Sequence, residues 1–278
     1  MGPKTAPRGD LTRTERKGLV YFQFACLSGF PKLSHQVFSR KGGLSRPPFD
    51  ELNVAFSVGD NQENVRANRR LVEKAADCRY TVYASQVHGT DILIYSGKEP
   101  AVAAGSGSPR SGDAMITDIP GLALAVQVAD CQAILIYDPA RKVVANIHSG
   151  WRGSVNDIAG KTVAAMENHF GCRGKDMVAA IAPSLGPCCS EFINYRSEIP
   201  EQLWDYKDDG HCFDFWKISC DQLENAGLRP VNIQPGGMCT RCRTDYFYSH
   251  RGEAGNTGRF VAVIGLKHVT PAGILNDS

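Results

Sequence analysis

The sequence predicts an α/β fold, a single domain with mixed β-sheets flanked by helices. Near-continuous apolar runs in the centre of the 278-residue chain are typical of strands buried on both faces: Leu122–Val128, Ala133–Tyr137 and Val143–Ile147. Apolar residues then recur with a 3.6-residue period from Val155 to Phe170, which predicts a helix that Ser154 opens with a Ser-x-x-Asp capping pattern. Strands and helices mix without a long linker, so one domain accounts for them.

The segments before this centre predict a tail, four short strands, a helix and a loop. Residues 1–18 are polar and predict a flexible N-terminal tail, which leaves residues 19–278 as the single domain. Apolar runs predict strands at Val20–Cys26, His35–Ser39, Tyr83–Ser85 and Ile92–Tyr95. Asp60 is the expected N-cap of a helix running to about Asp77, where apolar residues have helical spacing. Residues 97–112 are rich in small and turn-forming residues and predict a loop.

The segments after the centre complete the α/β pattern. We expect a strand at Val178–Ala182, a Pro/Gly turn, a helix around residues 216–226 and strands at 231–234 and 260–266. No internal repeat is visible in the sequence.

Composition and charge exclude several classes of protein. Hydrophobic residues make up 42% and charged residues 22%, which excludes a disordered, collagen-like or coiled-coil chain. The net charge is only +2, so the chain does not have the overall positive charge that is typical of a nucleic-acid-binding protein. Ten cysteines are too few for a disulfide scaffold. No export signal is visible, and Gln127, Asp130 and Gln132 interrupt the most apolar stretch, so we expect a cytoplasmic protein without a membrane span.

Three metal-capable side chains lie beside a glycine or at a predicted strand end: His88, Cys131 and His148. Structural zinc modules usually draw ligands from tight Cys and His pairs, whereas these three come from separate segments that must converge in the fold. Three His/Cys ligands with one open position are the arrangement of a catalytic zinc. The alternative for each residue is an ordinary core or surface side chain whose hydrogen bonds are satisfied and which binds no metal.

His148 is the best of the three on local grounds. It follows a buried strand, and ligand sites in α/β sheets lie at the carboxyl ends of strands. The helix that follows offers free backbone N–H groups to an anion, and Arg152 adds a planar cation suited to phosphate or carboxylate. The alternative is that Trp151-Arg152 forms a packing corner with the arginine on the surface.

Asp130-Cys131 interrupts an apolar region between two predicted strands. A buried carboxylate must be paired or serve chemistry, because burying it alone is costly. Cys131 is a core thiol, a nucleophile or a metal thiolate, and nearby histidines would favour the metal thiolate.

Cys239-Thr-Arg-Cys242 is a C-x-x-C motif, which suggests half a zinc site or a redox pair. The other candidate half, Cys188-Cys189, has no ligand spacing, because adjacent cysteines rarely chelate one ion. No βαβ start surrounds the motif as a thioredoxin-like site requires. We therefore favour a structural role.

Arginines recur in glycine-rich or turn settings. Arg40 precedes Lys-Gly-Gly, Arg251 precedes a glycine, and Arg259 follows Thr-Gly. Each is a surface charge in the usual case, but several converging on a metal pocket would form an anion clamp.

Taken together, these segments resemble the laccase-domain family, whose members carry the labels multicopper polyphenol oxidase and purine nucleoside phosphorylase. The most specific combination is QVHG, ADC and HxGWRG. The matching stretches run in family order from about Phe38 to Leu266: FSRKGGLS, ELNVAFSVGDNQENVRANRRL, SQVHGTDI, GDAMITDIPGLALAVQVADCQAILIYDP, VVANIHSGWRG, IAPSLGPCCSEF and CTRCRTDYFYSHRGEAGNTGRF.

The resemblance implies a single α/β domain with one catalytic zinc ion held by His88, Cys131 and His148. It also implies phosphorolysis of adenosine, inosine, guanosine and methylthioadenosine, together with adenosine deamination. The expected partners are purine nucleosides and phosphate, with the protein a monomer or a homodimer. Ser149 and Ser249-His250-Arg251 depart from the common Ala and Ser-Tyr-Arg, and this puts the substrate preference in doubt more than the metal site.

The histidine pattern disfavours copper. A multicopper oxidase needs paired His-x-His segments for its trinuclear cluster, and no two of the seven histidines are separated by a single residue. For a phosphorolytic site we expect Cys131, Asp130 and Arg152 to be catalytic and Arg40, Asp113 and Arg251 to bind substrate. Either aspartate is the expected proton carrier or ligand orienter.

Three other functions stay open. They are an editing hydrolase of peptidoglycan precursors, an activity linked to bacterial members of the family, a weak copper-dependent phenol oxidase, and a non-catalytic nucleoside-binding module.

Overall fold

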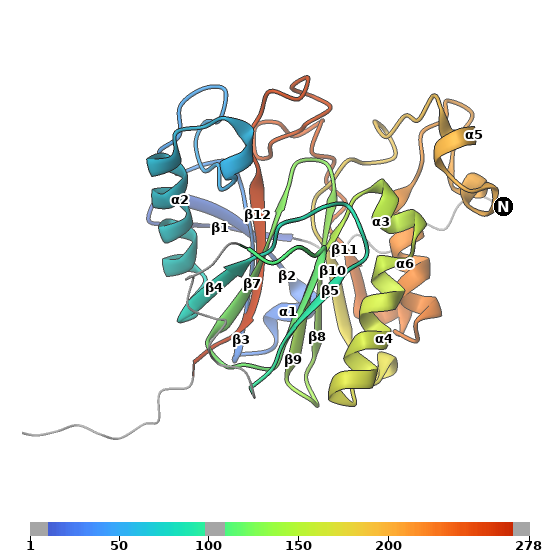
Figure 1. The fold of residues 1–278 in the computed structure, drawn as a ribbon, viewed down its shortest axis with the longest axis horizontal. Coiled ribbons are helices and arrows are strands. Elements are labelled where there is room, and N and C mark those ends of the chain that lie inside the picture. The colour runs from blue at the N-terminus through green and yellow to red at the C-terminus, as the bar shows by residue number, and fades with distance from the viewer. Residues whose placement is uncertain (1–10, 98–108, 269–278) are drawn as a thin grey trace, which may run out of the picture.

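A computed structural model describes residues 11–97 and 109–268. Two six-stranded sheets face each other, and helices cover their outer faces (Figure 1). This arrangement confirms the predicted α/β class with mixed sheets flanked by helices.

The first sheet is antiparallel except for its last pair, β7 and β4, which are parallel. In spatial order its strands are β1 (Leu11–Arg16), β2 (Leu19–Phe24), β3 (Leu33–Phe38), β12 (Phe260–Leu266), β7 (Leu122–Val128) and β4 (Tyr80–Tyr83).

The second sheet has antiparallel pairs in its centre and a parallel pair at each edge. In spatial order its strands are β11 (Ile233–Pro235), β10 (Val178–Ile181), β8 (Gln132–Asp138), β9 (Val143–Ser149), β6 (Ala114–Thr117) and β5 (Ile92–Tyr95).

Helix α2 (Gln62–Ala75) packs on the outer face of the first sheet, and α4 (Ile158–Phe170) and α6 (Phe215–Asn225) pack on that of the second (Figure 1). The shorter α-helices are α1 (Ala25–Ser28), α3 (Trp151–Val155) and α5 (Tyr195–Glu198). Single 3₁₀ segments occupy Phe56–Val58, Gly174–Asp176, Glu201–Tyr206 and Pro230–Asn232.

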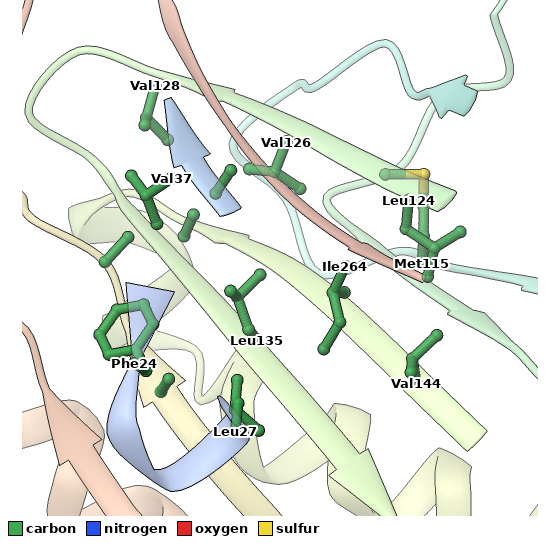
Figure 2. Packing of buried hydrophobic residues seen from close by; sticks show 14 of the residues in the cluster. Phe24, Leu27, Val37, Met115, Leu124, Val126, Val128, Leu135, Val144 and Ile264 are labelled. Atoms are coloured by element: carbon green, nitrogen blue, oxygen red, sulfur yellow. The ribbon is translucent and has the colours of Figure 1, made fainter. Parts of the chain in front are cut away.

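The central strands are apolar throughout because each of their faces lies in a different core. In β7, Leu124 and Val126 point between the sheets, whereas Ala123 and Ala125 point towards α2. The core between the sheets also takes side chains from β2, β3, β8 and β12, and Figure 2 shows part of it, with Phe24, Val37, Leu135 and Ile264 among its members. The continuous apolar runs therefore report double-sided burial, as predicted.

Several predicted boundaries are wrong. The strand expected at Tyr83–Ser85 is β4 at Tyr80–Tyr83, and the strand expected at 231–234 begins only at Ile233. The expected tail ends too late, because Leu11–Arg16 pair along their whole length with β2, while residues 1–10 lie outside the described part. Asn61 rather than Asp60 caps α2, since its side chain accepts the backbone N–H groups of Glu63 and Asn64. The expected loop 97–112 is a separate case, because most of it falls outside the described residues and its boundaries are not tested.

The helix start at Ser154 is also wrong. The chain forms the short helix α3, breaks at Asp157 in the left-handed region (φ 53°), and restarts as α4. The Asp157 side chain caps the new helix by accepting the backbone N–H of Gly160.

Candidate metal centre and cavity

His88, Cys131 and His148 meet at one end of the two sheets. His88 follows β4, Cys131 lies in the turn between β7 and β8, and His148 lies near the end of β9. One ligand atom from each lies within 4.8 Å of the others, and Nε2 of His88 is 3.9 Å from Sγ of Cys131. Among the three side chains, His88 is exposed, Cys131 is half-buried and His148 is buried. Solvent and small molecules would therefore approach an ion at this site from the side of His88.

Asp113 organises this group from behind. Its carboxylate accepts the backbone N–H groups of Val87, His88 and Gly89 and lies 2.8 Å from Nδ1 of His148. His88 has a positive φ of 60°, a strained conformation that these N–H contacts hold in place. The bond to Nδ1 leaves Nε2 of His148 as its ligand atom.

Two further contacts shape the centre. The Gln86 side-chain amide donates to the carbonyl of Gln127 and accepts its backbone N–H, which fastens the turn carrying His88 to β7. Gly150 lies against the group, and a Cβ at this position would be 2.9 Å from Cδ2 of His88 and 3.2 Å from Sγ of Cys131. Only glycine leaves that space open.

Electrostatics favour a thiolate at Cys131. Burial alone would raise the pKa of this thiol, but the neighbouring His148 and His88 outweigh it and lower the pKa to about 6. Burial would lower the pKa of His148, yet Cys131 and Asp113 raise it to about 9. Burial also works against ionised Asp113, but His148 and the backbone N–H of Gly89 hold its pKa below the ordinary value. The centre therefore contains a ready ligand anion with a buried carboxylate behind it.

Asp130 joins three segments beside the centre. Its carboxylate accepts hydrogen bonds from Oγ1 of Thr240, Oγ of Ser249 and the backbone N–H of Arg251, all at 2.6–2.7 Å. Its backbone has a φ of 85°, so these contacts hold a strained residue next to Cys131. These contacts tie together the loops on either side of Cys131, which suits the expected role of Asp130 as an orienter.

A cavity of about 1240 Å³ opens in front of the metal-binding group. Arg251 and Arg259 line it, as a convergent anion clamp requires. Burial lowers the pKa of Arg259, while Cys131 and Asp130 raise it in partial compensation, so a desolvated cation lies near the thiol. Aromatic side chains supply flat apolar walls: Phe56, Tyr83, Trp151, Phe192 and Phe215.

Three of the predicted site residues lie elsewhere. Arg40 is buried, donates to the carbonyls of Asp50 and Thr244 and to Glu253, and is not among the described residues that line the cavity. This placement does not fit the expected contact with substrate. Arg152 is exposed, with its guanidinium 5.1 Å from the ring centroid of Trp151, as in the packing-corner alternative. Asp113 lies behind His148 rather than at the described cavity wall.

Sequence reasoning missed several cavity residues. Arg69 of α2 lies 3.8 Å from the ring centroid of Tyr83 and 4.4 Å from that of Phe56, and lines the cavity with them. The buried Tyr83 hydroxyl has no hydrogen-bond partner among the described residues. Arg69 looks like an ordinary charge in an amphipathic helix, so only the packing of α2 beside β4 reveals it.

A second group of metal-capable side chains lies outside this centre. Cys188, Cys189, Cys239 and Cys242 bring their sulfur atoms within 4.8 Å of one another. The sequence spacing argued against Cys188-Cys189 as the other half of the C-x-x-C motif, yet a turn brings both cysteines to Cys239 and Cys242. In the described part of the chain, no helix combines the length and apolarity that crossing a membrane requires.

Comparisons with known proteins agree with this architecture. "Purine nucleoside phosphorylase YlmD" of Geobacillus stearothermophilus is 32% identical over 242 residues, covering 82% of this chain and 88% of the relative. "Purine nucleoside phosphorylase" of Bacteroides thetaiotaomicron is 30% identical over 257 residues, covering 87% and 94%. The crystal structure of the Geobacillus YlmD superposes with a TM-score of 0.81 at 29% identity, covering 92% of this chain and 98% of that one.

The family model described as "Multi-copper polyphenol oxidoreductase laccase" matches residues 34–267. This match includes His88, Cys131 and His148, the whole second sheet, and the first sheet except for β1, β2 and the first residue of β3. The chain belongs to the multi-copper polyphenol oxidoreductase laccase family.

Proposed function

We propose that this protein is a zinc-dependent purine nucleoside phosphorylase that acts on adenosine, inosine, guanosine and S-methyl-5'-thioadenosine and also deaminates adenosine. One observation carries the proposal: His88, Cys131 and His148 meet in the wall of a cavity that is also lined by four arginines, Arg251 and Arg259 among them, and by several aromatic rings. Relatives about 30% identical to the chain are named purine nucleoside phosphorylases, which supports the same substrate class.

The donor set fits zinc. Two imidazoles and one thiolate are typical zinc ligands, Asp113 orients His148 as zinc sites require, and Gly150 leaves room beside the group. When bound, a zinc ion with three protein ligands supplies a Lewis acid with an open position, the chemistry that deamination needs. Asp113 keeps Nε2 of His148 free for the ion.

Arg259 and Arg251 are suited to hold phosphate. Phosphorolysis joins a phosphate oxygen to the ribose carbon as the bond from that carbon to the purine breaks, and the purine leaves with the bonding electrons. Positive charge develops on the ribose, so the protein must hold an anionic nucleophile next to it. Asp130 fixes the backbone of Arg251, and the carbonyls of Thr257 and Gly258 fix the guanidinium of Arg259.

The aromatic walls are suited to the nucleoside. Tyr83 and Phe56 lie on one side with Arg69, and Phe192 and Trp151 pack edge to face with ring centroids 6.1 Å apart. Flat apolar surfaces exclude water and bind a purine through its faces.

The test is to incubate the protein with adenosine, with and without phosphate, and to separate adenine, inosine and hypoxanthine by chromatography. Adenine that forms only with phosphate establishes phosphorolysis, and inosine establishes deamination. Cys131→Ala should remove bound zinc and turnover together. Faster cleavage of a UDP-MurNAc-type amide, copper-dependent phenol oxidation, or nucleoside binding without product would each replace the proposal with the corresponding alternative.

A further inference from the structure

The four cysteines outside the cavity form a compact cluster. Cys188 and Cys189 lie in the turn after β10, and Cys239 and Cys242 lie in a turn after β11. Sγ of Cys242 is 3.7 Å from Sγ of Cys188 and 3.6 Å from Sγ of Cys189. None of the four is among the described residues that line the cavity.

These spacings match the ligands of one metal ion. With a zinc–sulfur bond of about 2.3 Å, two sulfurs of a tetrahedral site lie about 3.8 Å apart. A disulfide would join its sulfurs at about 2.05 Å. All ten cysteines are free, and Sγ of Cys242 lies at the separation of neighbouring ligands, rather than of bonded atoms, from Sγ of Cys188 and Sγ of Cys189.

The local backbone explains how adjacent cysteines face one point. The backbone N–H groups of Cys189 and Ser190 both donate to the carbonyl of Gly186, which closes a tight turn. A Cβ on Gly186 would lie 3.0 Å from Cβ of Cys239 and 2.9 Å from the Trp216 ring, so glycine lets the two turns approach. Backbone N–H groups of Gly186 and Cys242 donate to the Cys239 sulfur and fix its position between the two turns.

The two turns are also joined through the backbone. Ser184 donates its N–H to the carbonyl of Met238, and its own carbonyl accepts the N–H of Thr240. Both turns then reach Asp130, whose carbonyl accepts the N–H of Leu185 and whose carboxylate accepts the hydroxyl of Thr240. Asp130 precedes Cys131, so the cysteine cluster lies behind the loops that shape the metal centre.

We propose that Cys188, Cys189, Cys239 and Cys242 bind one structural metal ion of the zinc type, separate from the centre at His88, Cys131 and His148. Four thiolates select zinc over hard cations, and four protein ligands leave no open position, which is the mark of a structural site. The ion fastens the turn 186–189 to the turn 239–242. It thereby supports the strained backbone of Asp130 from outside the cavity.

Metal stoichiometry tests the proposal. The full chain, reduced and then equilibrated with buffered Zn²⁺, should hold two equivalents by elemental analysis. Cys188→Ser/Cys242→Ser should hold one, and so should His88→Ala/His148→Ala. Cys212→Ser changes a free cysteine outside the cluster and should keep two. If the wild type and Cys188→Ser/Cys242→Ser hold the same number of equivalents, the proposal is overturned.

Spectroscopy and stability separate a metal site from a redox pair. In the His88→Ala/His148→Ala variant, Co²⁺ should produce thiolate-to-metal absorption bands that disappear when Cys242→Ser is added. A chelator should lower the Tm of this histidine variant, in which the cysteine cluster is the remaining site. Absence of the bands, an unchanged Tm, or a disulfide among the four cysteines in mass spectra of freshly reduced, metal-equilibrated protein would overturn the proposal. These readouts do not depend on nucleoside turnover.

Discussion

The carboxylate of Asp113 lies 2.8 Å from Nδ1 of His148, and both side chains are buried. The same carboxylate accepts three backbone N–H groups from the turn that carries His88. One side chain therefore sets the tautomer of one predicted ligand and the backbone of another. The geometry of the candidate metal centre therefore depends on Asp113 as well as on His88, Cys131 and His148.

Asp113→Asn should lower zinc affinity by about 10- to 100-fold, the usual effect of losing a carboxylate behind a ligand histidine. The amide has one oxygen in place of two and no charge, so it cannot serve His148 and three N–H groups equally. Competition with a chromophoric chelator measures the affinity. Asp176→Asn makes the same change at a surface pair with Arg173 and should leave the affinity unchanged. An Asp113→Asn variant with wild-type affinity would contradict the assigned role.

Gly150→Ala should weaken zinc binding about tenfold or more while leaving the fold intact. The backbone of Gly150 (φ −74°, ψ 173°) is open to alanine, so the new methyl group acts only through its contact with His88 and Cys131. Gly29→Ala is the matched control, since Gly29 has φ −71° and a methyl group there would meet no atom within 4 Å. The zinc affinity and Tm of both variants provide the comparison, and equal zinc affinities would refute the steric argument.

Arg259→Met should raise the KM for phosphate by about 10- to 100-fold, because a charge-assisted hydrogen bond to an anion is worth about 1.5–3 kcal/mol. Steady-state kinetics with varied phosphate measure the effect. Arg40→Met removes a buried cation that binds Glu253 and two carbonyls, and it should lower the free energy of unfolding by about 3 kcal/mol. Its KM for phosphate should stay unchanged at a temperature where it is folded. A reversal of these two phenotypes would show that the arginine assignments are wrong.

Stability should fall as the pH drops from 6.5 towards 4, in part because of His35. Burial lowers the pKa of this imidazole to about 4, and its Nε2 accepts the backbone N–H of Phe24. In this pH window the unfolded chain binds a proton that the folded protein does not. At pH 5 the expected loss from this group is about 2 kcal/mol, and it is absent above pH 7.

Urea unfolding of wild type and His35→Gln at pH 7 and pH 5 measures this loss. The difference between the two pH values should be about 2 kcal/mol smaller in the variant, because its residue 35 does not titrate. His169→Gln changes an exposed histidine of α4 and should behave like the wild type. Equal pH dependence in wild type and His35→Gln would remove His35 as the cause.

The sequence predictions were accurate where a local apolar pattern defines the element, and less accurate where the local pattern is weak or continues past a break in the backbone. The strand at residues 260–266 was predicted with its correct bounds, and the central strands within two residues, because a continuous apolar run requires burial on both faces. The helix start at Ser154 was wrong, because periodicity continues through Asp157 although the backbone there turns left-handed. Residues 11–16 were missed as a strand because an edge strand with exposed polar side chains has little apolar signal.

By itself, the sequence determined the α/β class, the central strands and the three residues of the candidate metal centre, since local apolar patterns and family motifs are written along the chain. Only the tertiary structure decided which arginines line the cavity and which cysteines lie together. It separated Arg40 from Arg251 and Arg259, added Arg69 to the cavity, and brought Cys188 and Cys189 to Cys239 and Cys242. The physical reason is that these contacts join segments far apart in the chain, and their distances depend on how the two sheets and their turns pack.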